Sequence, residues 1–233
     1  MINRRHIIAG FISVAAVMVK QDPLAAGIAL PDKIEWKEFT ARMKELSELF
    51  AVGGVDQRGM EQKGLQLISR LDIDAPSFDE AVNNSYESGN LFWLWQRMIK
   101  SGRLDGGILN IDRTQMIPLH DHPGATGMVR VISGETEVWK FERLGTDVHQ
   151  PGKAQLKLIF HGILRPGDTA TVTPQNGNIH ALRSVSEECR MLDFFIPPFE
   201  RRDLLYFKPD DDNWFDKSQI SCRAIPRTEF TRS

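Results

Sequence analysis

The sequence contains little cysteine, and this shortage excludes several classes of protein. Cys189 and Cys222 are the two cysteines among 233 residues. They are too few for a disulfide scaffold and too far apart for a CxxC metal or redox motif. One bridge between them stays open as an alternative to two buried thiols, because sequence alone does not place their α-carbons.

The sequence also lacks an excess of charge of either sign. Lysine and arginine number 29, against 31 aspartates and glutamates, so no strong overall field attracts nucleic acid or an anionic membrane. We therefore expect no nucleic-acid partner. With 41% hydrophobic residues, the chain is long enough for one sizeable core with a helical extension, and we expect a single catalytic domain.

The apolar run at the N-terminus is short for a membrane span. It covers residues 7–19 behind Arg4 and Arg5, which is the pattern of a signal peptide. We expect removal of residues 1–26 by cleavage after Ala26, and an exported protein, periplasmic or secreted, without stable membrane association. The arginine pair also resembles a twin-arginine signal. The alternatives are a general secretory signal, an uncleaved anchor and, if the segment is no signal, a cytoplasmic location.

A helical pattern is predicted over residues 27–104. Apolar side chains recur three and four residues apart, as in Trp36, Phe39 and Met43, which is typical of the buried face of a helix. A further helix is expected over residues 90–100, whose apolar stripe consists of Leu91, Leu94, Trp95 and Met98. We interpret the region as a helical cover whose aromatic residues, including Trp95, pack and have no functional role.

Residues 105–233 show short runs with alternating apolar residues, which are typical of an antiparallel sandwich or barrel. Glycine, proline, aspartate and asparagine separate these runs. The candidate strands are residues 108–111, 127–132, 135–141, 156–163, 169–173, 180–184 and 190–196. The predicted fold class is therefore mainly β, a small antiparallel jelly-roll barrel with an N-terminal helical cover, in which residues 105–233 form the catalytic domain.

Three histidines stand where predicted strands begin or end. His120 and His122 are two residues apart at the end of an apolar run, and on a strand this spacing turns both imidazoles to one face. His180 follows a turn at the start of another strand. Adjacent strands of a small barrel can aim all three at one interior point. Neutral imidazoles there suit iron, zinc, copper or nickel, and leave coordination positions open.

The histidines belong to a wider pattern of glycines and prolines. The first half of the pattern consists of His120, His122, Gly127 and Gly134, and the second half of Gly167, Pro174, Gly177 and His180. Together they resemble the two motifs of the cupin superfamily, with one residue of extra spacing in the second. Where the usual first motif has a glutamate ligand, this chain has Gly127, so the resemblance implies a three-histidine set without a carboxylate.

Longer segments narrow this resemblance. They are IPLHDHPG at 117–124, GMVRVISG at 127–134, LRPGD at 164–168, TPQNGNIH at 173–180 and LDFFIPP at 192–198. Taken together they resemble the thiol dioxygenases, in the branch that contains 2-aminoethanethiol dioxygenase and the plant cysteine oxidases. The resemblance covers about residues 108–208, whereas the N-terminal helices match only in general character.

That resemblance implies a cofactor and a reaction. The cofactor is Fe(2+), held by His120, His122 and His180, and both atoms of dioxygen are added to a thiol sulfur to give a sulfinate. An all-neutral ligand set leaves the iron doubly positive, which favours binding of a thiolate. The implied partners are dioxygen and a small amino-thiol (cysteamine or cysteine) or the N-terminal cysteine of a peptide. We expect the protein to be a monomer.

Two further residues match positions near the site in that branch. Asp193 would accept hydrogen bonds from a substrate ammonium or from species bound to iron, and its alternative is an ion pair with Arg183 or Arg190. Tyr206 matches a tyrosine near the site, and its alternative is a packing role with one hydrogen bond. We therefore take Asp193 and Tyr206 as candidate catalytic residues.

The sequence departs from that branch at two positions. Leu204 replaces the cysteine that can form a thioether cross-link to the tyrosine in the mammalian-type enzyme, so no such cross-link is expected. Phe199 replaces a tyrosine, which removes one hydroxyl from the pocket. Asp121, between the paired histidines, is expected to point away from the ion. His149 and His161 are interpreted as surface or locally bonded side chains.

Three alternatives stay open at this point. The same barrel and ion can serve another reaction, catalysed by a lyase, an isomerase or a carbon-centred dioxygenase. A non-catalytic cupin that stores or senses a metal or a small ligand would keep the barrel without turnover. The three histidines can also hold zinc, by ligand chemistry alone.

Overall fold

The described part of the structure contains three long helices and two antiparallel sheets. The computed structural model describes residues 32–89, 94–113, 115–145, 149–175, 177–198 and 204–230. The predicted signal peptide, residues 1–26, lies outside this part, and so does Phe199. The helices and strands described below fall within one compact unit, Pro31–Ser233. Among the described helices, none is both long and apolar enough to cross a membrane.

The N-terminal helices form a cover over one sheet. They are α1 (Trp36–Ala51), α2 (Gln57–Arg70) and α3 (Pro76–Asn83). The first buries Phe39, Met43 and Leu46 on one face, as the three-and-four spacing predicts. The side chain of Asp56 caps the second by accepting a hydrogen bond from the Gly59 N–H at 2.7 Å.

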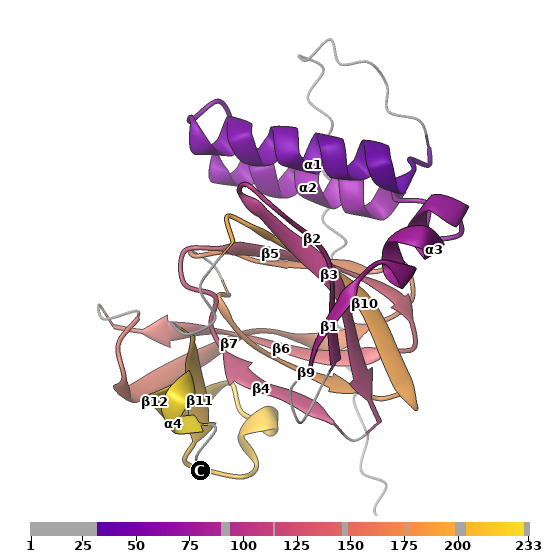
Figure 1. Ribbon diagram of the computed structural model, residues 1–233. Helices are drawn as coiled ribbons and strands as arrows, with labels where there is room; N and C mark the ends of the chain where they lie inside the picture. The colour runs from indigo at the N-terminus through magenta and orange to yellow at the C-terminus, as the bar shows by residue number, and fades with distance from the viewer. Residues whose placement is uncertain are drawn as a thin grey trace, which may run out of the picture. The chain divides into compact units, whose positions relative to one another are not determined.

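The second helix is fixed directly to the sheet. Arg130 of β5 (Thr126–Ser133) donates hydrogen bonds to the carbonyl oxygens of Ile68 and Leu71, at 3.1 and 2.8 Å, at the C-terminal end of α2. Gly64 leaves room for Met128, because a Cβ there would lie 2.2 Å from the methionine sulfur. Figure 1 shows α1 and α2 side by side above the sheet that contains β5.

The predicted helix over residues 90–100 is wrong where the structure describes it. Leu94–Ser101 is strand β2, and it pairs antiparallel with β3 (Leu104–Asp112), as in Trp95 opposite Leu109. A short apolar run does not distinguish a helical period from a strand period. Here the long-range pairing prevails, because it satisfies the backbone groups of both strands. The helical region thus ends with α3.

Twelve strands are described. Besides β2, β3 and β5 they are β1 (Tyr86–Gly89), β4 (Met116–His120), β6 (Thr136–Leu144), β7 (Gly152–Leu164), β8 (Thr169–Val172), β9 (Ile179–Ser184), β10 (Glu188–Ile196), β11 (Leu205–Pro209) and β12 (Gln219–Pro226). One sheet has the order β1-β2-β3-β10-β5-β8, and the other closes into a barrel in the order β11-β12-β7-β6-β9-β4. Short η2 (Trp214–Asp216) and α4 (Arg227–Phe230) flank β12. The predicted mainly β fold, an antiparallel barrel with an N-terminal helical cover, is confirmed.

Alternation along the strands sends neighbouring side chains to different interiors. On β4, Ile117 and Leu119 are two residues apart but join different cores, because the register of β4 against β9 shifts between Ile117 and His120. On β9, Ile179 and Ala181 face the first core and Leu182 faces the second. On β9, a polar residue in phase with Leu182, such as His180, is therefore directed to the space that both sheets line.

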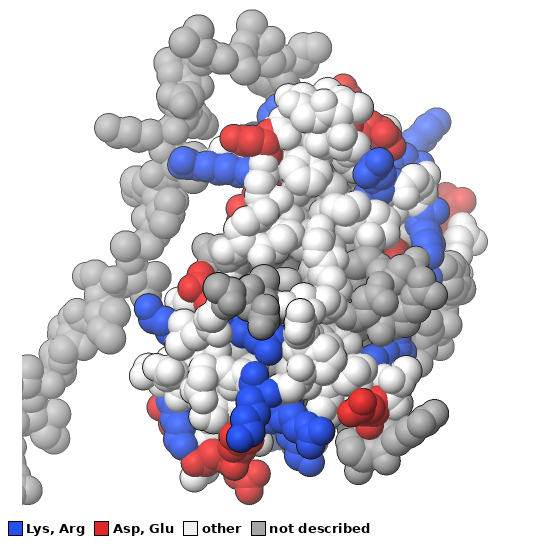
Figure 2. Space-filling model, turned by 90° about the vertical axis from the view of Figure 1, so that its left-hand side faces the viewer, with Lys and Arg blue, Asp and Glu red and all other residues white. Residues whose placement is uncertain are grey.

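The exposed charges are mixed in sign on the face that Figure 2 shows. Basic and acidic side chains alternate there with large areas of other residues. This distribution agrees with the near balance of 29 basic and 31 acidic residues in the sequence. A small-molecule site is therefore better sought in the interior than in a charged surface field.

Candidate functional site

Three histidines converge at the end of β4 and the start of β9. His120 is the last residue of β4 and lies opposite His180 of β9 in the antiparallel register. His122 follows the strand by two residues, and its backbone N–H donates a hydrogen bond to Asn178 Oδ1 at 3.0 Å. The turn before β9 thus holds the segment that carries His122. All three histidine side chains are buried.

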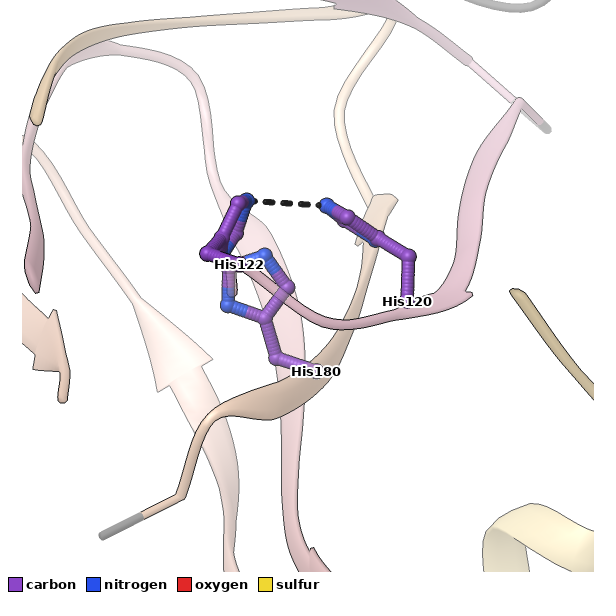
Figure 3. A group of neighbouring side chains, drawn as sticks. All are labelled: His120, His122 and His180. Atoms are coloured by element: carbon purple, nitrogen blue, oxygen red, sulfur yellow. Dashed lines mark hydrogen bonds between the residues drawn. The ribbon is translucent and has the colours of Figure 1, made fainter. Parts of the chain in front are cut away.

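The ring geometry brings the nitrogens to one point. His120 Nε2 lies 3.2 Å from His122 Nε2, and the ring centroids lie 4.7 Å (His120–His122), 4.7 Å (His120–His180) and 4.9 Å (His122–His180) apart. One nitrogen of each ring lies within 4.8 Å of the others. Figure 3 shows the three rings turned toward one another. Among the described residues this is the group suited to hold a metal ion.

A backbone hydrogen bond fixes the orientation of the first ring. His120 Nδ1 lies 2.8 Å from the Pro118 carbonyl oxygen, which can only accept, so Nδ1 carries the proton. The unprotonated Nε2 is then the atom that faces His122. A carbonyl partner on the far nitrogen is the usual arrangement of a metal-binding histidine, because it sets both the tautomer and the ring plane.

Burial keeps the third histidine neutral. It lowers the pKa of His180 well below the ordinary value, and the charges of His120 and Lys140 lower it further. A neutral imidazole has the free lone pair that metal binding requires. Two nitrogens bound to one ion at roughly 2.1 Å each can be at most roughly 4.2 Å apart, and the 3.2 Å pair of His120 and His122 meets this limit. With His180 in the same group, within 4.8 Å, the three neutral imidazoles are the kind of donors that a divalent transition metal binds.

Asp121 points away from the ring cluster, as predicted, and ties it to β11. Its Oδ1 accepts a hydrogen bond from the Leu205 N–H at 2.9 Å, and its own N–H donates to the Leu205 carbonyl at 3.1 Å. Its Oδ2 lies 2.8 Å from His149 Nδ1. Burial raises the pKa of Asp121, and the bonds from Leu205 and His149 oppose that shift. The interpretation of His149 as locally bonded is confirmed.

His161 also has a local partner, at a distance from the three-histidine cluster. Its Nε2 lies 2.8 Å from Glu137 Oε1, and its ring stacks on Trp139 with centroids 5.0 Å apart. It belongs to β7, whose register places it opposite Trp139 of β6. This confirms the interpretation of His161 as a locally bonded side chain.

Gly127, which stands where the usual first motif has a glutamate ligand, has no space for a carboxylate side chain. A Cβ added at Gly127 would lie 2.9 Å from Val172 Cγ2 and 3.1 Å from Phe195 Cε1. Both neighbours pair with Gly127 in the sheet, on β8 and β10. The three-histidine set is therefore built into the packing of this wall, because a glutamate here would displace a valine or a phenylalanine.

A cavity opens on the histidine cluster. The residues that line it are Trp95, Leu109, Ile117, His120, His122, Val129, His180, Leu182, Asp193, Phe195, Leu204, Tyr206 and Arg227. They come from both sheets, so the cavity lies between them. Its volume is about 70 Å³, and one water molecule needs roughly 10–15 Å³ of such space. It therefore admits a small molecule or the end of a larger one.

The structure places both candidate catalytic residues in this cavity wall. Asp193 of β10 is 9% exposed, while its two predicted ion-pair partners bond elsewhere: Arg183 to Glu137 and Arg190 to Asn110. Tyr206 of β11 lies opposite His120 in the register, with ring centroids 5.9 Å apart. Its ring also stacks on Phe230 at 4.2 Å. Their catalytic roles stay predictions.

Beyond the three histidines, Asp193 and Tyr206, the lining residues were not predicted as part of the site, among them Trp95, Leu204 and Arg227. Trp95, assigned to packing alone, is buried against Phe195 and also lines the cavity. Leu204 occupies the wall where the related branch can have a cysteine. Arg227 is the first residue of α4, directly after β12 and beyond the motifs. Alternating apolar residues at 220, 222 and 224 were a usable signal for β12, but not for its position beside the histidines.

The two cysteines are not among the residues that line the cavity, and they are not bridged. Cys189 and Cys222 are free, and they are buried in separate core clusters. Burial raises the pKa of each thiol to about 12. This excludes the disulfide and leaves the alternative of two buried thiols.

Comparisons with curated proteins give partial matches to thiol-oxidising enzymes. The chain is 33% identical over 104 residues to a probable 2-aminoethanethiol dioxygenase of Dictyostelium discoideum, covering 42% of this chain and 47% of that protein. It is 26% identical over 116 residues to 2-aminoethanethiol dioxygenase of Mus musculus, covering 42% and 45%. The chain thus spans about half the length of the curated relatives it matches.

A solved structure and a protein family also match. An uncharacterised protein with a double-stranded β-helix domain from Klebsiella pneumoniae is 20% identical, with a TM-score of 0.37 over 50% of this chain and 86% of that one. Residues 96–222 match the family described as PCO_ADO. The predicted resemblance to the cupin-type thiol dioxygenases is confirmed. Because the match covers more than half of the 233 residues, the chain belongs to the PCO_ADO family.

Proposed function

We propose that this protein is an iron(II)-dependent thiol dioxygenase, which adds both atoms of dioxygen to the sulfur of a small amino-thiol. The observation that carries the proposal is the meeting of three buried imidazoles at a small cavity that also contains a carboxyl side chain. The printed names of the curated relatives support the same reaction class. Cysteamine, cysteine and an N-terminal cysteine of a peptide are the candidate substrates.

The donor set suits iron or zinc, and the dioxygenase names of the curated relatives favour iron, because zinc has no redox chemistry with dioxygen. His120, His122 and His180 would hold the ion on one side, and non-haem iron sites of oxygenases have three protein ligands with open positions for substrate and dioxygen. When bound, iron supplies a positive charge for the thiolate and the ability to activate dioxygen. The overall change, R–SH + O2 → R–SO2H, forms two sulfur–oxygen bonds, breaks the oxygen–oxygen bond and needs no external reductant.

The remaining cavity residues orient the substrate and keep water out. The Asp193 carboxyl group would accept hydrogen bonds from a substrate ammonium, which sets the amine end of an amino-thiol at β10. Tyr206 adds a hydroxyl group to the same wall. Apolar residues such as Leu109, Ile117 and Phe195 fill much of the rest, which strengthens polar contacts by lowering the local dielectric.

The proposal is tested by replacing one ligand and measuring iron and oxygen together. The full chain, purified without oxygen and loaded with Fe(2+), is assayed for bound iron and for oxygen uptake with cysteamine, cysteine and a Cys-initiated peptide. His180→Ala is expected to lose bound iron and oxygen uptake together. His161→Ala is the matched control, because His161 bonds Glu137 away from the cavity, and it is expected to keep both.

Two outcomes would contradict the proposal in different ways. Normal iron content in His180→Ala would refute the ligand assignment. Iron binding by the wild type without oxygen uptake on any thiol would refute the reaction and favour another cupin activity or a non-catalytic cupin. Preferential loading with zinc, with turnover dependent on zinc, would refute the choice of metal.

A further inference from the structure

The cavity wall contains one carboxyl group and one guanidinium. Among the described residues that line the cavity, Asp193 is the acidic one and Arg227 is the basic one, histidines aside. Asp193 lies on the open six-stranded sheet, between β3 and β5. Arg227 lies where β12 of the closed barrel leads into α4. The two opposite charges thus reach the cavity from different sheets.

The position of Arg227 is fixed by backbone pairing. Its N–H donates a hydrogen bond to the Leu204 carbonyl at 3.2 Å, and Leu204 is itself part of the cavity wall. The preceding residue, Pro226, lies opposite Leu205, whose neighbour Tyr206 lies opposite His120. The backbone of Arg227 therefore lies about two strand spacings, roughly 10 Å, from β4, the strand that carries His120. An arginine side chain and one small substrate together can span that distance to the histidine cluster.

A guanidinium in a small, largely apolar cavity has a specific chemical use. It is a permanent cation with a planar fork of N–H donors, which matches the two oxygens of a carboxylate. Arg227 is half-buried, so its interaction with a bound anion is screened less than on an open surface. Neither cysteamine nor the α-carbon of an N-terminal cysteine residue has a carboxylate to occupy this position.

We propose that Arg227 binds a substrate carboxylate, so that the preferred substrate is a free α-amino-acid thiol such as cysteine. This inference rests on the proposed thiol dioxygenase function and names its substrate class. Sulfur would face the three histidines, the ammonium would face Asp193 and the carboxylate would face Arg227. Three contacts from three directions fix the orientation of a substrate, whereas cysteamine can make two of them.

The test compares thiols that lack one group at a time. Cysteine has both charged groups, cysteamine lacks the carboxylate and 3-mercaptopropionate lacks the amine. Arg227→Gln is expected to lower kcat/KM for cysteine and 3-mercaptopropionate about 10- to 100-fold more than for cysteamine, the usual range for a lost hydrogen bond to a charged group. Asp193→Asn is expected to affect cysteine and cysteamine more than 3-mercaptopropionate.

Binding without turnover gives a second readout. Calorimetric Kd values are measured without oxygen for the same three thiols on the iron-loaded full chain. Arg227→Gln is expected to weaken cysteine more than cysteamine here as well. Arg223→Gln is the matched control, since Arg223 lies on β12, four residues before Arg227, and its side chain is exposed. Arg227→Lys keeps the charge without the fork and is expected to recover part of the affinity for cysteine.

The outcomes separate this inference from the proposed function. Oxygen uptake on none of the thiols refutes the dioxygenase itself. Uptake on all three with equal losses in Arg227→Gln, or a wild type that prefers cysteamine over cysteine, refutes carboxylate recognition alone. If Arg227→Gln fails to fold, as judged by its thermal transition and iron content, Arg227→Lys replaces it in the test. The ratio of the cysteine Kd to the cysteamine Kd is then compared between Arg227→Lys and the wild type, and an unchanged ratio overturns the inference.

Discussion

Asp121 offers the sharpest test of how the histidine pair is held. Its carboxylate is 2% exposed and makes two contacts that differ in environment: the buried Leu205 N–H at 2.9 Å and the part-exposed His149 Nδ1 at 2.8 Å. Asp121→Ala removes both. A buried N–H left without its acceptor costs about 1–3 kcal/mol, while the contact to the part-exposed histidine contributes about 0–1 kcal/mol.

We therefore expect Asp121→Ala to lower the free energy of unfolding by about 2–3 kcal/mol. Asp121→Asn keeps an oxygen that can accept from Leu205, so its loss should be about 1 kcal/mol. His149→Ala leaves the Leu205 bond intact and should cost less than about 1 kcal/mol. The measurement is urea unfolding of the metal-free chain, with the midpoint and the slope compared between variants, because a changed slope would signal a different unfolding transition.

The same variants also report on the metal. Loss of the Asp121 carboxylate leaves the backbone bond to the Leu205 carbonyl as the remaining contact of residue 121 with β11, and loss of a supporting contact typically lowers metal affinity about 10- to 100-fold. Iron affinity is measured by competition with a chelator. Two results would refute the reasoning. One is an equal loss of stability in His149→Ala and Asp121→Ala, and the other is an Asp121→Ala protein with unchanged stability and unchanged iron affinity.

Two further predictions concern the core around the site. Gly107→Ala places a Cβ 2.1 Å from the Gln96 carbonyl oxygen of the neighbouring strand. Because that backbone cannot move easily, the free energy of unfolding should fall by about 1–3 kcal/mol. An unchanged thermal midpoint would contradict this. Cys189 and Cys222, with each thiol pKa raised to about 12, are roughly 10⁻⁴ thiolate at pH 8, so Ellman's reagent should label both only after unfolding. Rapid labelling of the native chain would show that a core is open.

The histidine cluster could be predicted from sequence because its signal is local. His120 and His122 share one face by spacing, and the turn before His180 marks the start of a strand. The glycine in place of a carboxylate was also readable, and the structure adds its physical reason in the packing of Val172 and Phe195. Local chemistry and strand period were sufficient for this part of the site.

The rest of the wall depends on pairings between distant segments. Residues 94–101 have an apolar spacing that fits a helix as well as a strand, and their pairing with β3 decides the outcome. Arg227 reaches the cavity because β11 pairs with both β12 and β4. No periodicity within residues 204–230 indicates which strand of the barrel they will join.

The closure of the barrel at β11 has a consequence for assembly. Ribosomal synthesis adds residues in chain order, so all three histidines emerge before residues 204–227, which contribute one side of the cavity wall. Until that last hairpin docks, the edge of β4 that bears His120 has no neighbour at Tyr206. The nascent chain therefore presents the ion-binding cluster from a side that the finished protein closes.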